Sequence, residues 1–271
     1  MSALAATASV PLLRVAGLGK SFGGVRAVDG IHFDLAAGEL LALIGPNGAG
    51  KSTTFNMVNG QLRADSGSIQ LDGQELVGRK PREIWRRGVG RTFQIAETFA
   101  SLTVVENVQM ALLSQDGKLF SMWRRATDYR RDDALAVLDL VGMKSQAERS
   151  CNVLAYGDVK RVELAIAMAN DPKLLLMDEP TAGMAPKERN ELMALTKQLV
   201  IDRNMAVLFT EHSMDVVFAH ADRMIVLARG RLIAQGRPAD IRRNPQVQQV
   251  YFGTGSTFAL DAAAPAAGIT T

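Results

Sequence analysis

The stretch GPNGAGKS, from Gly45 to Ser52, decides the fold class of this sequence. It matches the pattern G-x4-G-K-[ST], in which a glycine-rich turn presents backbone N–H groups to nucleotide phosphates. The apolar run LLALI (40–44) precedes it as a strand, and a helical pattern follows from Ser52. A glycine-rich turn with an exposed lysine is the alternative, and the flanking strand and helix argue against it. The sequence therefore predicts a nucleotide-binding loop.

The residues of this loop are expected to divide the phosphate contacts among them. Backbone N–H groups from Gly48 to Lys51 cradle the β-phosphate, and the Lys51 ammonium reaches the β- and γ-phosphates. The Ser52 hydroxyl binds Mg²⁺, and Thr53 places a second hydroxyl near the α-phosphate. The nucleotide-binding candidates in this stretch are Gly45, Pro46, Asn47, Gly48, Ala49, Gly50, Lys51, Ser52 and Thr53.

A second candidate set lies in LLLMDEP (174–180), where an apolar run ends in two carboxylates. A buried strand delivers Asp178 to the metal, directly or through water. Glu179 alternates to the other side and can polarise the attacking water. A strand that ends in an acidic turn is the plain alternative, which the matching phosphate loop makes less favoured.

Two further polar residues follow strand patterns. His212 in FTEHS comes just after an apolar run, so a γ-phosphate contact is favoured over an ordinary surface or core histidine. Gln94 in GRTFQ is a candidate metal and water ligand, and a plain loop glutamine is an equal alternative. Both would lie at the sheet edge that carries the other motifs.

Strands alternate with helical patterns along most of the chain, which indicates an α/β fold with a largely parallel core sheet. The expected strands are 12–16, 25–35, 40–44, 68–72, 89–93, 173–177 and 206–210, with a hairpin over 223–236. The expected helices start at Ser52, Val159 and Pro186, cover 106–113 and 128–143, and include a short one after 210. The early strands suggest an antiparallel flank. With the phosphate loop quoted above, we expect a P-loop NTPase (RecA-like) core with this antiparallel flank and an inserted helical subdomain.

One domain is predicted over residues 10–256. Its core comprises 10–96 and 155–238, its helical subdomain 97–154, and its C-terminal helical extension 239–256. Residues 1–10 and 257–271 are of low complexity and are expected to be disordered.

Charge, cysteine content and the length of apolar runs argue against several classes of protein. The net charge of +3 is mild and does not argue for nucleic acid. The single cysteine, Cys151, excludes a disulfide framework and is expected to be a structural or surface thiol. No apolar run approaches the ~20 residues that cross a bilayer. A role at a membrane would therefore run through a partner.

Five motifs, GPNGAGKST, GRTFQ, LAYGDVKR, LLLMDEP and TEH, occur in this order and resemble the nucleotide-binding domain of ABC transporters. They stand at the family's Walker A, Q-loop, signature, Walker B and H-loop positions, and the likeness spans roughly residues 12–253. Within the family the chain is most similar to the ATP-binding subunits of bacterial branched-chain amino acid importers. That likeness is carried by KSFGGVRAVDGIHFDL, GRTFQIAETFASLTVVENV and RRNPQVQQVYFGTG.

The resemblance implies that two ATPase subunits pack head to tail. Each ATP then lies between one subunit's P-loop and the other's signature helix. The residues expected to face the partner's ATP are Ala155, Tyr156, Gly157 and Asp158. Phe22 falls where the family stacks an aromatic ring on adenine, although a glycine-flanked phenylalanine also fits a turn.

The resemblance also implies ATP and Mg²⁺ as cofactors and a peripheral position on the cytoplasmic face of the inner membrane. The implied partners are a second ATPase subunit, identical or related, two permease subunits and, indirectly, a periplasmic binding protein. Residues 97–107 would receive a permease loop. The cluster of Trp123, Arg124, Arg125, Tyr129, Arg130 and Arg131 either contacts lipid headgroups or the permease or forms a solvated helix face.

Two positions depart from the family pattern. Ala155 stands where the signature usually has a serine that bonds the γ-phosphate, a bond worth about 1.5–3 kcal/mol. Ala185 stands where Asp or Asn is common. Ala155 is expected to weaken the site that this chain completes for its partner, and Ala185 weakens the argument for polar cross-talk between the two sites. The chain's own P-loop site is expected to be catalytic.

Three alternatives remain open. The chain could serve another ABC system, for urea, amides or lipopolysaccharide export. It could be a cytosolic ABC ATPase that moves no solute. It could also sense ATP without turnover, as Ala155 and Ala185 suggest, but the intact Glu179 and His212 argue against this.

Overall fold

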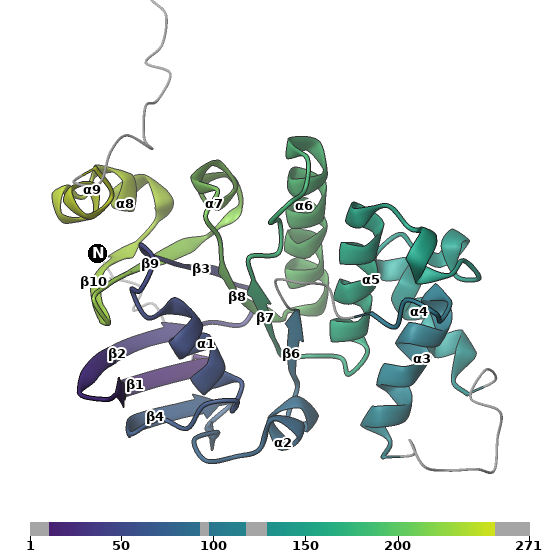
Figure 1. Ribbon diagram of the computed structural model, residues 1–271, viewed down its shortest axis with the longest axis horizontal. Helices are drawn as coiled ribbons and strands as arrows, with labels where there is room; N and C mark the ends of the chain where they lie inside the picture. Colours follow the sequence, from purple (N-terminus) through teal and green to yellow (C-terminus); the bar gives the residue numbers. More distant parts are fainter. Residues whose placement is uncertain (1–10, 93–97, 118–128, 253–271) are drawn as a thin grey trace, which may run out of the picture.

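The structure is a computed structural model and describes residues 11–92, 98–117 and 129–252. Two sheets lie next to each other, and helices gather around the larger one (Figure 1). The predictions for Gln94 and for Trp123, Arg124 and Arg125 fall outside the described residues.

The larger sheet has six strands in the order β10-β9-β3-β8-β7-β6. Its inner strands pair in parallel, and only β10 runs antiparallel to its neighbour β9. The strands are β3 (Leu40–Ile44), β6 (Val89–Thr92), β7 (Leu174–Asp178), β8 (Ala206–Thr210), β9 (Arg223–Ala228) and β10 (Arg231–Gly236). Strands β3 and β8 are buried at every position, which is why each reads as an unbroken apolar run.

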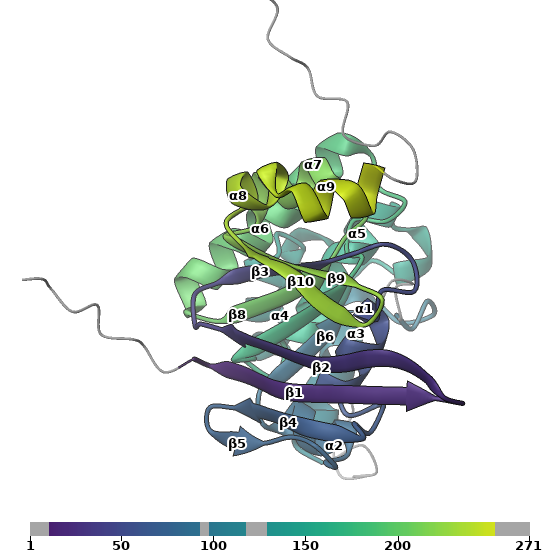
Figure 2. The ribbon, with the colours of Figure 1, turned by 90° about the vertical axis from the view of Figure 1, so that its left-hand side faces the viewer.

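The smaller sheet is antiparallel, in the order β2-β1-β4-β5. Figure 2 shows it beside the larger sheet, with the long strands β1 and β2 at the side that faces the viewer. The strands are β1 (Leu13–Phe22), β2 (Val25–Leu35), β4 (Ser66–Leu71) and β5 (Gln74–Glu75). This sheet is the predicted antiparallel flank.

The helices fall into groups. Helices α3, α4 and α5 lie together at one end of the molecule, and α8 and α9 lie at the other end, next to β9 and β10 (Figures 1 and 2). The bounds are α1 (Lys51–Val58), α2 (Pro81–Arg86), α3 (Val104–Gln115), α4 (Arg131–Leu140), α5 (Tyr156–Met168), α6 (Pro186–Arg203), α7 (Met214–His220), α8 (Pro238–Arg243) and α9 (Pro245–Phe252).

The larger sheet separates two hydrophobic cores. Along β3 the side chains alternate: Leu40, Ala42 and Ile44 belong to the core that includes α3, α4 and α5. Leu41 and Leu43 belong to the core shared with the smaller sheet. The strand that leads into the glycine loop is therefore fixed from both faces.

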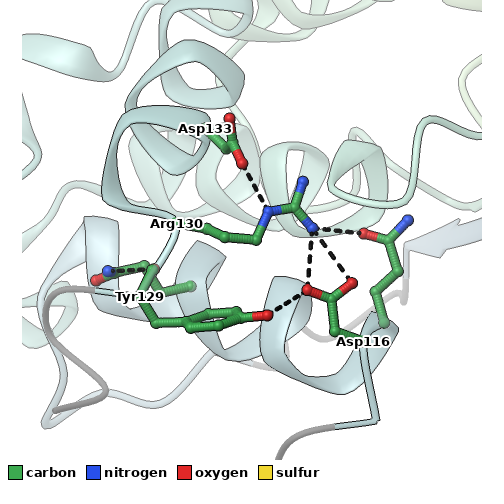
Figure 3. A network of polar contacts seen from close by, with 6 residues as sticks. Asp116, Tyr129, Arg130 and Asp133 are labelled. Atoms are coloured by element: carbon green, nitrogen blue, oxygen red, sulfur yellow. Dashed lines mark hydrogen bonds and ion pairs between the residues drawn. The ribbon is translucent and has the colours of Figure 1, made fainter. Parts of the chain in front are cut away.

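Polar contacts join the end of α3 to the start of α4 (Figure 3). The Tyr129 hydroxyl donates to Asp116, and the Arg130 guanidinium lies 2.6 Å from Asp133 and 3.5 Å from Asp116. Arg131 pairs with a glutamate, Glu148. The described members of the predicted basic and aromatic cluster therefore contact their own subdomain, and its role toward a membrane or permease stays a prediction.

Cys151 is a buried thiol next to α3. Its Sγ accepts a hydrogen bond from Asn107 Nδ2 at 3.2 Å, and burial raises the pKa of the thiol. The same Asn107 amide donates to the Phe99 and Thr103 carbonyls, so this residue ties down the chain before α3. Of the two options predicted for Cys151, the structure shows the structural one.

Some predicted boundaries were wrong. β1 does not end at Ala16 but continues to Phe22, because register shifts after Val15 absorb the glycines that look like strand breakers. Helix α5 begins at Tyr156 rather than Val159. The six-residue helix α2 was not predicted.

Gly90 gives the first prediction, because it lies where β6 meets α5. A Cβ built on Gly90 would be 2.6 Å from the Ala167 carbonyl oxygen, so Gly90→Ala is expected to destabilise the fold by about 1–3 kcal/mol. Urea unfolding would measure this. Gly236→Ala is the matched control, since its added Cβ meets its nearest atoms only at 3.7 and 3.9 Å. Equal stability of the two variants would contradict this close approach.

Candidate active site

The predicted motifs lie at one edge of the larger sheet. Gly45 follows the end of β3, Asp178 is the last residue of β7, and Thr210 is the last residue of β8. These three strands are parallel, so their carboxyl ends meet at the same edge. Open α/β sheets bind ligands at this edge.

The glycine loop packs too closely for side chains at two positions. A Cβ on Gly45 would lie 2.3 Å from the Leu227 carbonyl oxygen, and one on Gly50 would lie 2.4 Å from that of Ala27. Gly50 has φ of 102° and directly precedes α1, and Gly48 (φ 75°) has open space around it. The backbone thus curls tightly into the start of the helix, leaving room beside Gly48. Ser52 is exposed at this helix start.

Lys51 lies inside the loop. Its side chain donates to the Gly45 carbonyl at 2.7 Å and to the Pro46 carbonyl at 3.2 Å, and only 8% of the residue is exposed. Burial lowers the pKa of the Lys51 ammonium, and the charges of Glu179 and Asp178 oppose that shift. The lysine and both carboxylates therefore share one electrostatic environment.

Asp178 is oriented from two sides. The Thr210 hydroxyl donates to one oxygen, Oδ1, at 2.7 Å. On the other side the Arg91 guanidinium lies 3.5 Å from Oδ2. Arg91 also donates to Asn56 at the end of α1 and to Gln61 beyond it.

Glu179 and His212 are in contact. His212 Nε2 lies 2.8 Å from Glu179 Oε1. Glu179 has φ of 48°, a left-handed conformation that is uncommon for a residue with a side chain. The Thr210 hydroxyl and carbonyl both accept from the Glu179 N–H, at 3.1 and 3.2 Å. A strained residue held this way is typical of a functional site.

The predicted signature residues lie at the start of α5, on the opposite side of strands β6, β7 and β8 from α1 (Figure 1). Ala155 precedes the helix without a side-chain cap, and Tyr156 is 45% exposed. Gly157 is buried, and a Cβ there would meet the Glu188 carboxylate of α6 at 3.2 Å. The Asp158 carboxylate accepts from Gln146 at 3.2 Å. This cluster is thus separate from the P-loop of the same chain.

Phe22 lies at the tip of the hairpin formed by β1 and β2. It pairs with Val25 across the turn, is 49% exposed, and has the Lys20 ammonium 5.6 Å from its ring centroid. The Lys20 ammonium lies over one face of the ring, so a stacking partner would use the other face or displace this lysine. Phe22 is also the last strand residue before the glycine turn. Its position is therefore compatible with both predictions, an adenine-stacking ring and a turn residue.

A cavity of about 990 Å³ lies beside the glycine loop. Residues 46–49 form one wall, and Gln246 and Gln249 of α9 line it as well. Arg229, in the β9–β10 turn, lines the cavity too, and so does Arg231, the first residue of β10, which pairs with the lining residue Asp29 at 2.8 Å. The C-terminal helix α9 thus borders the loop predicted to hold phosphates.

Sequence reasoning missed several supporting residues. Thr210, Glu211 and Arg91 contact the predicted site residues or their loops, but their own types carry no distinctive signal. Thr210 and Glu211 come directly before His212 in FTEHS, and this closeness to a predicted site residue was the only signal that the sequence offered for them.

Comparison with known proteins agrees with this geometry. Residues 28–182 match the ABC transporter family, and residues 231–257 match a family described as branched-chain amino acid ATP-binding cassette transporter. The high-affinity branched-chain amino acid transport ATP-binding protein LivG of Escherichia coli K12 is 41% identical over 252 residues, covering 90% of this chain and 99% of LivG.

Solved structures show the same fold. The ADP conformation of an ATP-binding cassette of an ABC transporter has a TM-score of 0.82 and 30% identity, covering 90% of this chain and 100% of that one. A dimeric cassette in a post-hydrolysis state, bound to ADP and Pi, has a TM-score of 0.70 and 25% identity, covering 83% of this chain and 98% of that one.

These matches confirm the fold class and the family predicted from the five motifs. Within residues 11–92, 98–117 and 129–252, none of the helices is both long and apolar enough for a membrane span. The P-loop, the paired carboxylates and the likeness over most of the chain agree: this protein belongs to the ABC transporter family and is one of its nucleotide-binding ATPase subunits.

Proposed function

We propose that this chain hydrolyses Mg-ATP to drive an importer of branched-chain or other hydrophobic amino acids. The contact of Glu179 with His212 at 2.8 Å, at the sheet edge that also carries Lys51, is the observation that supports turnover most directly. The amino acid substrate class is supported by the name of LivG and by the description of the family matched at 231–257.

In the proposed reaction Lys51 and the loop N–H groups hold the phosphates. The hydrogen bonds of Lys51 to the Gly45 and Pro46 carbonyls, at 2.7 and 3.2 Å, keep its ammonium within the loop and support this role. Glu179 accepts a hydrogen bond from the attacking water and orients it toward the γ-phosphorus. His212 holds Glu179 and contacts the γ-phosphate, stabilising charge as the bond to the leaving ADP breaks.

The donors available for Mg²⁺ fit that ion. Asp178 and Ser52 offer a carboxylate and a hydroxyl, and oxygen ligands are what Mg²⁺ prefers. The Thr210 hydroxyl fixes Asp178 at 2.7 Å, as expected for an outer-shell partner of a metal ligand. Gln94 completes the proposed set. The ion would neutralise charge on the β- and γ-phosphates.

The proposed partner is a second ATPase subunit. A related cassette is dimeric with ADP and Pi bound, which supports pairing. Ala155, Tyr156, Gly157 and Asp158 would then face the partner's ATP with the backbone N–H groups at the start of α5. Two permease subunits and a periplasmic binding protein would complete an importer on the cytoplasmic face of the inner membrane.

Steady-state phosphate release from the full-length chain with Mg-ATP tests this function. Turnover is expected, and EDTA is expected to abolish it, because it would remove the ion that Asp178 and Ser52 would hold and that would neutralise phosphate charge. ATP binding without phosphate release would support a sensing module instead. Transport assays with reconstituted permeases would separate branched-chain amino acids from urea, amide or lipopolysaccharide systems.

A further inference from the structure

A buried carboxylate, Glu211, joins two loops at the edge of the active site. It lies between Thr210 and His212 in the chain and is only 5% exposed. Its Oε1 accepts from the Thr181 N–H at 2.8 Å and from the Thr181 hydroxyl at 2.6 Å. Its Oε2 accepts from the His212 N–H at 3.2 Å. Both oxygens are therefore engaged.

A carboxylate is costly to bury unless hydrogen bonds compensate it. Here all three donors come from the two loops that carry the reacting groups. Thr181 follows Glu179 by two residues, and His212 follows Glu211 directly. Hydrogen bonds to a charged acceptor are shorter and stronger than neutral ones, so this carboxylate fixes the spacing of the two loops.

Two further links join the same loops. The Arg189 guanidinium of α6 donates to the Ser213 hydroxyl at 2.9 Å and to the Met184 carbonyl at 2.7 Å. Thr210 accepts from the Glu179 N–H and donates to Asp178. The first link joins Ser213, after His212, to Met184, after Glu179, through Arg189. The second joins the last residue of β8, before His212, to Asp178 and to the Glu179 N–H.

We propose that Glu211 is a positioning residue of the ATPase, which holds the loop after β7 and the loop after β8 as one unit. A shift of either loop would change the 2.8 Å separation of His212 Nε2 and Glu179 Oε1. The carboxylate of Glu211 bonds Thr181 and the His212 N–H, so it would act through these loops and not on the nucleotide itself. This inference rests on the proposed function, in which Glu179 and His212 act together.

Glu211→Gln tests the link to His212. The amide oxygen keeps the two Thr181 donors, so the amide NH₂ faces the His212 N–H, and two donors cannot bond each other. A buried unsatisfied donor weakens this anchor, and we expect kcat to fall about tenfold with the KM for ATP within about twofold. Lost stability alone would reduce the amount of folded enzyme, which a measurement of the folded fraction would reveal, and would not lower kcat per folded molecule.

Thr181→Val and Thr181→Ser test the other end of the link. The valine removes the hydroxyl that donates at 2.6 Å, whereas the serine retains it, so only the valine should lower kcat. Thr196→Val is the matched control, because Thr196 is also fully buried and donates to the Leu192 carbonyl at 2.9 Å within α6. This pair also decides the proposal if Glu211→Gln does not fold.

Histidine NMR gives a readout that needs no turnover. The chain has three histidines, so ¹³C-labelled imidazoles give three signals, from His32, His212 and His220. Glu211→Gln and Thr181→Val are expected to move the His212 signal and to leave the other two unchanged.

Wild-type kcat together with an unmoved His212 signal in folded Glu211→Gln would overturn the proposal. So would a kcat loss that Thr196→Val shares. Failure of the proposed function looks different. Either the unchanged chain would release no phosphate, or Glu179→Gln would retain its turnover, whatever the His212 signal does in Glu211→Gln.

Discussion

Glu179→Gln is expected to lower ATP turnover about a hundredfold or more while ATP still binds. The amide keeps the size of the side chain but is a poor acceptor for the proton of the attacking water. The phosphate contacts of Lys51 and the loop are untouched. Phosphate release at saturating ATP measures the turnover, and a fluorescent-nucleotide titration measures the affinity.

Glu75→Gln is a suitable control for that variant. Glu75 accepts from the Ile69 N–H of β4 at 3.1 Å and from the Val77 N–H just after β5 at 2.9 Å, away from the site. Glu75→Gln should therefore leave ATP turnover unchanged. Unimpaired hydrolysis by Glu179→Gln would remove Glu179 from its proposed role.

The same slow variant reports on the partner. In size-exclusion chromatography, an ATP-dependent shift to a dimer would mean that Ala155 and Gly157 suffice to close a symmetric pair. ATP binding by a chain that stays monomeric would point to a different subunit, whose signature helix completes the site built on Lys51 and Glu179.

Lys51→Ala is expected to weaken Mg-ATP binding about tenfold to a hundredfold. One hydrogen bond to a charged group is worth about 1.5–3 kcal/mol, and 1.4 kcal/mol is about tenfold in affinity. Titration with a fluorescent nucleotide measures the loss. Lys173→Ala is the control, because that lysine pairs with Asp72 on the surface. Wild-type affinity in Lys51→Ala would count against the P-loop assignment.

Lys51 also predicts a pH dependence. Burial lowers its pKa from the ordinary lysine value of 10.5. Only the protonated form attracts phosphate, so nucleotide affinity should begin to fall, as pH rises, at a lower pH than an exposed lysine would give. The same titration repeated at alkaline pH measures this, and Lys51→Ala should lack that component.

The larger sheet was predictable because its central strands are short apolar runs. β3 and β8 have the predicted bounds, since strands buried on both faces give the clearest sequence signal. The full length of β1 was not predictable, because glycines such as Gly17 and Gly19 are typical of strand ends. The strand accommodates both where its register shifts, with Gly17 at φ 61°. Helix α2 buries only Ile84, too little to give a periodic pattern.

The site was predictable to the extent that it follows from parallel strand ends. Lys51, Asp178, Glu179 and His212 all come from such ends or from the loop after one. The contacts of Glu211 were not predictable, because its partner Thr181 lies 30 residues away and neither residue type is distinctive. Which polar side chain meets which loop depends on the packing of those loops, and one sequence does not reveal that.

The order of strands in the larger sheet has a practical consequence for anyone who shortens this protein. The match to the ABC transporter family ends at residue 182, yet β8 (206–210) lies between β3 and β7, and β9 lies on the other side of β3. A fragment cut at 182 would carry the whole Walker A and Walker B motifs but would leave β3 without either of its neighbours. Strand β9 in turn pairs with β10. Useful truncations therefore have to retain the chain at least through β10, at residue 236.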